Sequence, residues 1–288
     1  CSITPLHLIS GLNDRGAAMA KLPKRAAERI AAGLKRFQSI LSSAKARDVN
    51  ESDTVVIVTD LLQEVFGYDK YAEITSEHMI RGTFCDLAVK LEGALAVLIE
   101  VKAIGLELKE QHVKQAVDYA ANQGCEWVAL TNGVIWRVYK VSFGKPIEHE
   151  LVVDLDLLTI NAKKTDDVEL VGLLAKEGWQ KAQLGEYHSQ KQALSRFTLA
   201  ALIMGDPVAE LLRREIRRLS PDVRVDAEQI KAVIEAEVLK RDVLEGEKAD
   251  AARRQIAKAA GRMLRASKAD VATDASPPPA DPTSLPPA

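Results

Sequence analysis

The sequence lacks the features of a membrane-spanning or disulfide-bonded protein. Its 288 residues include three cysteines, Cys1, Cys85 and Cys125, and so sparse and odd a set favours a reducing compartment over a disulfide framework. Charged residues interrupt every apolar run before it is long enough to cross a bilayer. We therefore expect a cytoplasmic protein with no membrane partner. Because the chain begins with Cys1 rather than Met, and nothing after it suggests the export of a lipoprotein, we also expect a fragment or incomplete gene product.

Several kinds of chemical site are also missing. The formal net charge is -2, so any attraction to nucleic acid must come from local patches. The sequence has no Gly-x-x-x-x-Gly-Lys-Ser/Thr loop to bind a nucleotide and no Gly-x-Ser-x-Gly motif to carry a nucleophilic serine. Its histidines and cysteines show no zinc-ligand spacing. We therefore expect neither a nucleotide cofactor nor a structural zinc site.

What the sequence does contain is a charged triplet at the end of an apolar strand. Residues 84–91 and 94–102 are two apolar runs joined by a Gly-containing turn, which predicts a strand hairpin. Side chains repeat every second residue along a strand, so Glu100 and Lys102 share one face. Asp86 on the neighbouring strand supplies a second acid. Two carboxylates and an ammonium at the edge of a small sheet can bind a hard divalent cation through oxygen ligands.

The alternative for Glu100 and Lys102 is an ordinary ion pair at a sheet edge. A Glu-x-Lys triplet carries little information by itself, because the chain has another at Glu107 and Lys109, where it begins a polar helix. The apolar strand before Glu100 and the acid at Asp86 favour the metal site over the ion pair.

These residues resemble the Asp…Glu-x-Lys signature of the PD-(D/E)xK nuclease superfamily. Gln115 and Tyr119 are similar to the Gln-x-x-x-Tyr element that follows it in several branches. The sequence departs from the usual pattern at Cys85, where the superfamily has Pro. Over residues 50–151, the order and spacing of the motifs look most like the N-terminal nuclease domain of type I restriction enzyme R proteins. The resemblance implies a restriction-endonuclease-like α/β fold, with a mixed sheet flanked by helices.

The resemblance also implies roles for the acids. Asp86 and Glu100, with the backbone carbonyl of Val101, would hold Mg²⁺, for which Mn²⁺ could substitute. Glu51, at the start of a predicted helix, would help to assemble this site. A carboxylate there also suits the helix dipole, which is the simpler explanation. Glu64 is the less favoured candidate for the same role.

Other residues would complete the centre. Lys102 would orient the attacking water or stabilise developing charge. Gln115 would position water or phosphate, and Tyr119 would brace Gln115 or touch the DNA backbone. Arg81 and Lys114 are candidates for phosphate contacts, although solvation at the surface is the simpler explanation of each.

The function implied by the resemblance is that of a metal-dependent endonuclease that hydrolyses DNA, like a restriction-type nuclease domain without an ATP-driven translocase. DNA would be its partner, and a homodimer and restriction-system subunits are further candidates. The alternative is a catalytically idle, nuclease-like module that binds DNA or a protein. The two acids argue against an idle module, because it has no physical reason to keep unpaired carboxylates together.

Periodicity divides the chain into four parts. The helical spacing of apolar residues predicts a basic amphipathic helical arm over residues 1–49, whose basic face either follows a phosphate backbone or is simply solvated. Residues 50–154 hold the nuclease-like domain, residues 155–268 an all-helical accessory region, and residues 269–288 a disordered, Pro-rich tail. The expected helices are 51–66, 108–123, 166–176, 186–204, 207–219 and 226–244, and the expected strands are 71–77, 84–91, 94–102, 127–131 and 134–141.

Overall fold

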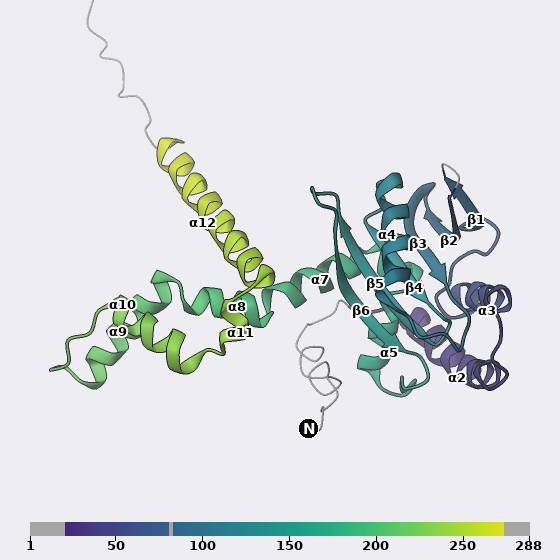
Figure 1. Cartoon of the computed structure of the whole chain (residues 1–288), viewed down its shortest axis with the longest axis horizontal. Coiled ribbons are helices and arrows are strands. Elements are labelled where there is room, and N and C mark those ends of the chain that lie inside the picture. The colour runs from purple at the N-terminus through teal and green to yellow at the C-terminus, as the bar shows by residue number, and fades with distance from the viewer. Residues whose placement is uncertain (1–20, 81–82, 274–288) are drawn as a thin grey trace, which may run out of the picture. The chain divides into compact units, whose positions relative to one another are not determined.

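The protein is described by a computed structural model over residues 21–80 and 83–273, which fold into two compact units, 21–189 and 190–273. Figure 1 shows the first unit as a sheet flanked by helices and the second as helices alone. The α/β class expected from the sequence is confirmed. Within the described residues, no helix is long and apolar enough to cross a membrane.

The first unit is built on a six-stranded sheet whose spatial order follows the chain order. Its strands are β1 (Ile74–Ile80), β2 (Thr83–Leu91), β3 (Ala94–Val101), β4 (Trp127–Thr131), β5 (Ile135–Ser142) and β6 (Glu148–Asp156). Neighbouring strands are antiparallel except for β3 and β4, which are parallel. A parallel pair needs a crossover connection, and α4 (Glu110–Gln123) provides it. The expected mixed sheet is therefore confirmed.

Strand β6 was not among the expected elements. Its burial pattern is irregular, because the adjacent residues Val152 and Val153 are both buried. Its register with β5 also shifts between Val138 and Tyr139. Such a strand lacks the strict alternation of apolar and polar residues that predicts a half-buried strand.

The predicted hairpin joins β2 to β3. Glu92 and Gly93 in its turn have φ angles of 52° and 81°, and two successive left-handed residues match the turn to the twist of the strands. Leu87 pairs with Ile99 across the hairpin. The beginning of β2 and the end of β3 therefore lie together, at the end of the hairpin away from its turn.

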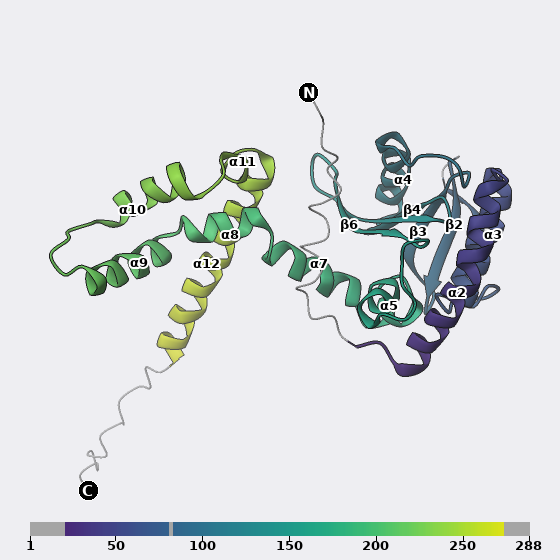
Figure 2. The same cartoon turned by 90° about the horizontal axis from the view of Figure 1, so that it is seen from below.

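Each face of the sheet carries its own hydrophobic core (Figure 2). Helices α2 (Lys24–Ala46), α3 (Glu51–Glu64) and α5 (Thr165–Gly172) cover the first core, and α4 covers the second. In β2, Leu87 belongs to the first core and Ala88 to the second. In β3, Leu98 belongs to the second and Ile99 to the first. Both faces of the central strands are thus buried, which accounts for their nearly continuous apolar sequence.

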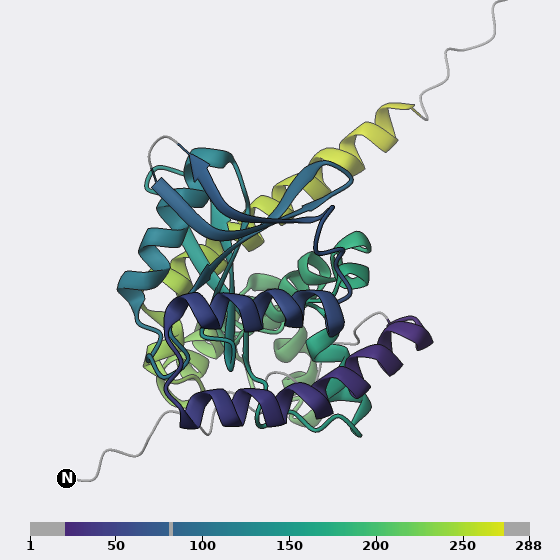
Figure 3. The same ribbon diagram turned by 90° about the vertical axis from the view of Figure 1, so that its right-hand side faces the viewer.

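Helix α2 contributes to the first core the apolar stripe that its sequence predicts. Ile30, Leu34, Phe37 and Leu41 are all fully or almost fully buried, and α2 lies beside α3 (Figure 3). The expected boundary at residue 49 does not coincide with a boundary between the two units, because this stripe belongs to the same core as the sheet.

Arg29 of α2 connects three segments of the first unit. Its two terminal nitrogens lie 2.8 Å from the two carboxylate oxygens of Glu177 in α6 (Lys176–Gln180). The guanidinium also donates to the carbonyls of Val65 and Phe66, at the end of α3. Helices α5 and α6 and the first half of α7 (Gln183–Ala193) therefore belong to the first unit, so the expected boundary at residue 154 does not separate the units either.

The described part of the second unit consists of helices. They are α8 (Arg196–Ile203), α9 (Asp206–Leu219), α10 (Ala227–Val233), the π-helical turn η2 (Ile234–Val238), α11 (Arg241–Leu244) and α12 (Glu247–Thr273). The helix expected over 186–204 is interrupted at Ser195, whose hydroxyl accepts a hydrogen bond from the Thr198 N–H and so begins α8. Helix α12 includes residues 269–273, which the sequence assigned to a disordered tail. Residues 274–288 of that tail lie outside the described residues.

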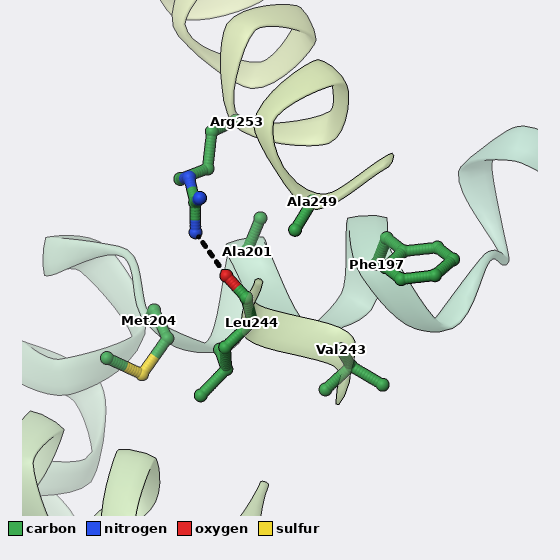
Figure 4. Close-up of a pocket in the computed structure, with 7 residues that line it drawn as sticks. All are labelled: Phe197, Ala201, Met204, Val243, Leu244, Ala249 and Arg253. Atoms are coloured by element: carbon green, nitrogen blue, oxygen red, sulfur yellow. Dashed lines mark hydrogen bonds between the residues drawn. The ribbon is translucent and has the colours of Figure 1, made fainter. Parts of the chain in front are cut away.

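Helices α8, α11 and α12 pack around a small apolar recess (Figure 4). It is lined by Phe197, Ala201, Met204, Val243, Leu244, Ala249 and Arg253. The one charged side chain among them, Arg253, donates to the Leu244 carbonyl and pairs with Asp250. Because that charge is already matched, we interpret the recess as packing between helices.

The burial of α2 predicts that its apolar stripe stabilises the first unit. Leu34→Ala should lower the free energy of unfolding by about 2–5 kcal/mol, as is usual for truncation of a buried leucine. The adjacent Lys35 is exposed, so Lys35→Ala should change it by less than about 0.5 kcal/mol. Urea unfolding followed by Trp fluorescence measures both. Equal effects of the two substitutions would contradict the role assigned to α2.

The Arg29–Glu177 pair predicts a pH dependence of stability. The hydrogen bond from Arg29 holds the pKa of Glu177 below its ordinary value of 4.5. A carboxyl with a lowered folded-state pKa stabilises the protein above its unfolded pKa and loses that effect as the pH falls through the folded pKa. Glu177→Gln should therefore cost about 1–3 kcal/mol at neutral pH, and the difference from wild type should shrink below pH 4.5. Urea midpoints measured across this range would test it, and a constant difference would argue against the pair.

Candidate metal and catalytic centre

The candidate site begins with a carboxylate buried at the end of strand β3. Glu100 is 3% exposed, and Leu98, which precedes it on the same strand face, belongs to the second core. A charged group in such surroundings is costly unless it is paired and hydrogen-bonded. The position of Glu100 therefore calls for a compensating cation.

Lys102 supplies one positive charge. Its Nζ lies 2.8 Å from Glu100 Oε1 and 3.6 Å from Glu51 Oε2. Its side chain is 13% exposed, and its backbone N–H donates to the Thr131 carbonyl at 2.8 Å, which continues the pairing of β3 with β4 beyond Val101. Both ends of this residue are thus held in place.

Asp86 reaches the same point from strand β2. Its Oδ2 accepts a hydrogen bond from the backbone N–H of Val101 at 2.7 Å. Because Val101 stands between Glu100 and Lys102, this bond holds the Asp86 carboxylate at the end of β3 that carries both of them. The two acids and the lysine expected to converge from the sequence are therefore close together.

Glu51 belongs to a helix rather than to the sheet, because it is the first residue of α3. The N-cap of this helix is Asn50, whose side chain accepts from the Asp53 N–H at 2.9 Å. An acid in the first turn is favoured by the helix dipole, and here it also faces Lys102. Glu64, by contrast, pairs with Arg36 near the other end of α3 and takes no part in this cluster.

The charges of the cluster affect one another. Burial raises the pKa of Glu100 above its usual range, with the Lys102 hydrogen bond opposing it and the charges of Asp86 and Glu51 adding to it. Burial tends to lower the pKa of Lys102, but the hydrogen bond and charge of Glu100, aided by the other two acids, raise it overall. The carboxylates of Glu100, Asp86 and Glu51 thus all act on the charge of Lys102.

The loop after Lys102 is fixed by the turn after β4. The Asn132 side chain donates to the Leu106 carbonyl at 3.0 Å, and its Oδ1 accepts from the N–H groups of Val134 and Ile135. The Ile104 N–H donates to the Val49 carbonyl, just before α3. These contacts hold the end of β3 against the start of α3, where Glu51 lies.

Helix α4 carries the two other residues that the resemblance implied. Gln115 is exposed, whereas Tyr119 is 5% exposed and belongs to the second core. Lys114 is exposed on the same helix. No contact connects Gln115 or Lys114 to the acids among those that the described residues make, and Arg81 lies outside the described residues.

His112 is a neighbour of the site that the sequence analysis did not assign to it. Its Nδ1 accepts from the Lys109 N–H at the start of α4. Burial and the positive charges of Lys102 and Lys109 lower its pKa, while Glu51 opposes them. The available signal was its helical spacing, since His112 stands three residues before Gln115 and so shares its face.

The donor set fits a hard divalent cation. Asp86, Glu100 and the Val101 carbonyl offer oxygen atoms, which are the ligands that hard divalent cations take. In the described part of the chain, no three His, Cys, Asp or Glu side chains are grouped as a ready-made metal cluster. Mg²⁺ in particular is commonly bound by one or two carboxylates together with water and substrate phosphates, and such a site needs no third acidic side chain.

Comparison with known proteins identifies a family that part of the chain resembles. Residues 57–155 match the family model of the type I restriction enzyme R protein N terminus. The match spans β1 to β6 and includes Asp86, Glu100 and Lys102, while Glu51 precedes it. No curated protein and no solved structure matches the chain. The sheet-bearing segment of this chain is therefore similar to the N-terminal domain of type I restriction enzyme R proteins, which confirms the resemblance seen in the sequence.

Proposed function

We propose that the chain is a metal-dependent endonuclease that hydrolyses phosphodiester bonds of DNA. The observation that carries the proposal is the buried Glu100 carboxylate, held beside Asp86 and Lys102. An ordinary surface ion pair does not account for this burial. The family match to a restriction-enzyme domain supports a nuclease as the class of enzyme.

In this proposal, Asp86, Glu100 and the Val101 carbonyl hold Mg²⁺, with Mn²⁺ as a substitute. The bound ion would lower the pKa of a water molecule and neutralise charge on the phosphate. Asp86 is oriented for this by the Val101 N–H. Glu51 assists from the start of α3 by balancing the charge of Lys102.

In this proposal, Lys102 orients the attacking water or stabilises the developing negative charge. Its raised pKa keeps the ammonium charged, and its contacts with Glu100 and Glu51 fix its direction. An ammonium that is positioned beforehand stabilises developing charge without reorganisation.

The residues of α4 have supporting roles. Gln115 is exposed and would position water or a phosphate oxygen, with Tyr119 bracing the helix from the second core. Lys114 and Arg81 would contact the DNA backbone, a role that positions the substrate without reading its sequence.

A titration with metal separates this function from that of an idle module. A ligand that binds only the native state stabilises it by about 2.7 kcal/mol at one hundred times its dissociation constant. Mg²⁺ or Mn²⁺ should therefore raise the melting temperature of the wild type in differential scanning fluorimetry. Asp86→Asn should abolish most of this shift, and Asp166→Asn, which removes an exposed acid in α5, should keep it. An unchanged melting temperature, or the same shift in Asp86→Asn, would favour the idle module.

Cleavage tests the catalytic assignment, and the chain offers a matched control. Glu100→Gln keeps the shape of the side chain and removes a ligand charge, so cleavage of supercoiled plasmid with Mg²⁺ should fall at least about a hundredfold. Glu107→Gln alters the second Glu-x-Lys triplet, in which Glu107 is exposed, and should cleave like the wild type. EDTA should stop both the wild type and Glu107→Gln. Wild-type rates in a folded Glu100→Gln protein would exclude Glu100 from the site, and single-stranded DNA run in parallel would define the substrate.

A further inference from the structure

Helix α12 carries a run of positive charge that no acid interrupts. Residues 251–268 contain neither Asp nor Glu, in a chain whose formal net charge is -2. The basic residues in this range are Arg253, Arg254, Lys258, Arg262, Arg265 and Lys268. A local excess of one sign on a chain of nearly balanced charge attracts a partner of the opposite sign.

Most of these cations form one stripe along the helix. Residues three or four positions apart lie on the same side of an α-helix, and this spacing joins Arg254, Lys258, Arg262, Arg265 and Lys268. At 1.5 Å per residue, the stripe extends about 21 Å from its first position to its last. Like charges at these spacings destabilise a helix, so a bound polyanion would stabilise it.

The side of α12 that carries the stripe is not used in packing where the structure describes its side chains. Helix α12 packs on α8 near its beginning, where Ala249 and Ala252 are buried, and it then extends away from α8 (Figure 1). Arg254 and Lys258 are both exposed. Among the ion pairs that the described residues make, none includes either of them. These two cations are therefore available to a partner.

The acids of α12 and of the neighbouring helices leave the stripe positive. Glu247 and Asp250 belong to the first turn of α12, and Asp250 pairs with Arg253. Asp270 follows the stripe, and α8 contains no acid. The acids in and beside α11 are paired, Asp242 with Arg196 and Glu245 with Arg241.

We infer that the basic side of α12 lies along the phosphate backbone of DNA. Phosphates repeat along each strand, so a row of cations on one helix can meet several of them at once. Such contacts hold the substrate without reading its sequence. The inference rests on the proposed function for the choice of DNA, and it adds to that function a binding surface in the second unit, outside the candidate active site.

A membrane surface fits this helix less well. A helix that lies among lipid headgroups needs a broad apolar face, commonly with Trp, Phe or Leu, opposite its cations. Helix α12 contains no aromatic residue. Its side opposite Arg254 and Lys258 begins with Ala249 and Ala252, which are buried, and continues with the half-buried Ile256. Little apolar surface therefore remains there for a bilayer.

Binding of a fluorescent DNA duplex to the full-length chain, measured by anisotropy in EDTA, tests the inference apart from cleavage. The stripe variant, Arg254→Gln with Lys258→Gln and Arg262→Gln, should raise the dissociation constant at least about tenfold. Each phosphate contact contributes about 0.9 to the slope of log K against log salt, so this slope should fall by about two to three. Lys258→Gln alone should lower it by about one. Helical circular dichroism should be unchanged, because Gln favours helices about as well as Arg and Lys.

Two further variants separate the stripe from charge in general. Arg254→Lys with Arg262→Lys keeps both charges and should keep the wild-type salt slope. Lys163→Gln with Lys164→Gln and Lys181→Gln removes the same charge from exposed positions of the first unit, and it should bind DNA like the wild type.

The outcomes for this surface and for the metal site are distinct. Wild-type affinity and salt slope in a folded stripe variant would overturn the inference, as would equal losses in the Lys163, Lys164 and Lys181 variant. A wild type that fails to bind the duplex at low salt would overturn it too, and binding to phosphatidylserine vesicles in that case would assign the stripe to membranes. The stripe variant should keep the rise in melting temperature with Mg²⁺. A wild type that binds DNA through the stripe but shows no such rise would contradict the metal site alone.

Discussion

The burial of one carboxylate, Glu100, is the constraint on which the organisation of the candidate site depends. An acid at the end of an apolar strand is stable only if its charge is compensated. Lys102 compensates it from the next position on the same strand face, and the lysine is held in turn by Glu51 and by the pairing of its backbone with Thr131. Removal of Lys102 would leave the buried Glu100 charge without this match, whereas removal of the half-exposed Glu51 would leave the Glu100–Lys102 pair in place.

The topology of the sheet explains why these groups meet. Because β3 and β4 are parallel, both run toward the same edge of the sheet, and the crossover helix α4 must start near the end of β3. The turn after β4 consequently lies beside the loop after Lys102, where Asn132 can reach Leu106. The antiparallel hairpin brings the start of β2, with Asp86, to the same edge. The order and direction of the strands thus bring together residues that are far apart in the sequence.

The sequence predicted the features that follow from short-range pattern and missed those that depend on packing. The convergence of Asp86 with Glu100 and Lys102 follows from hairpin geometry and the two-residue repeat of a strand, so it was predictable. The apolar stripe of α2 was predictable too. The sequence did not predict which surface this stripe packs against, because periodicity shows that a helix has a buried face without identifying what covers it. Strand β6 was missed since adjacent valines broke its alternation, and the nearness of His112 to Lys102 required the tertiary structure.

Each unit contains residues in unfavourable surroundings: a buried charge in the first unit and exposed apolar side chains in the second. In the first unit, an acid is buried where its charge is costly, and Lys102 compensates that charge. In the second, leucine and valine side chains stay in water, although the first core of the other unit buries 21 leucine and valine residues. Helices α9 and α10 pack together with one groove between them and cannot enclose the remaining apolar surface of both. Among the described residues that surface is exposed, and covering it would contribute about 25 cal/mol per Å² of apolar area. The like charges that follow one another along α12 are unfavourable as well. Residues in positions that cost free energy are therefore the best guides to function in both units.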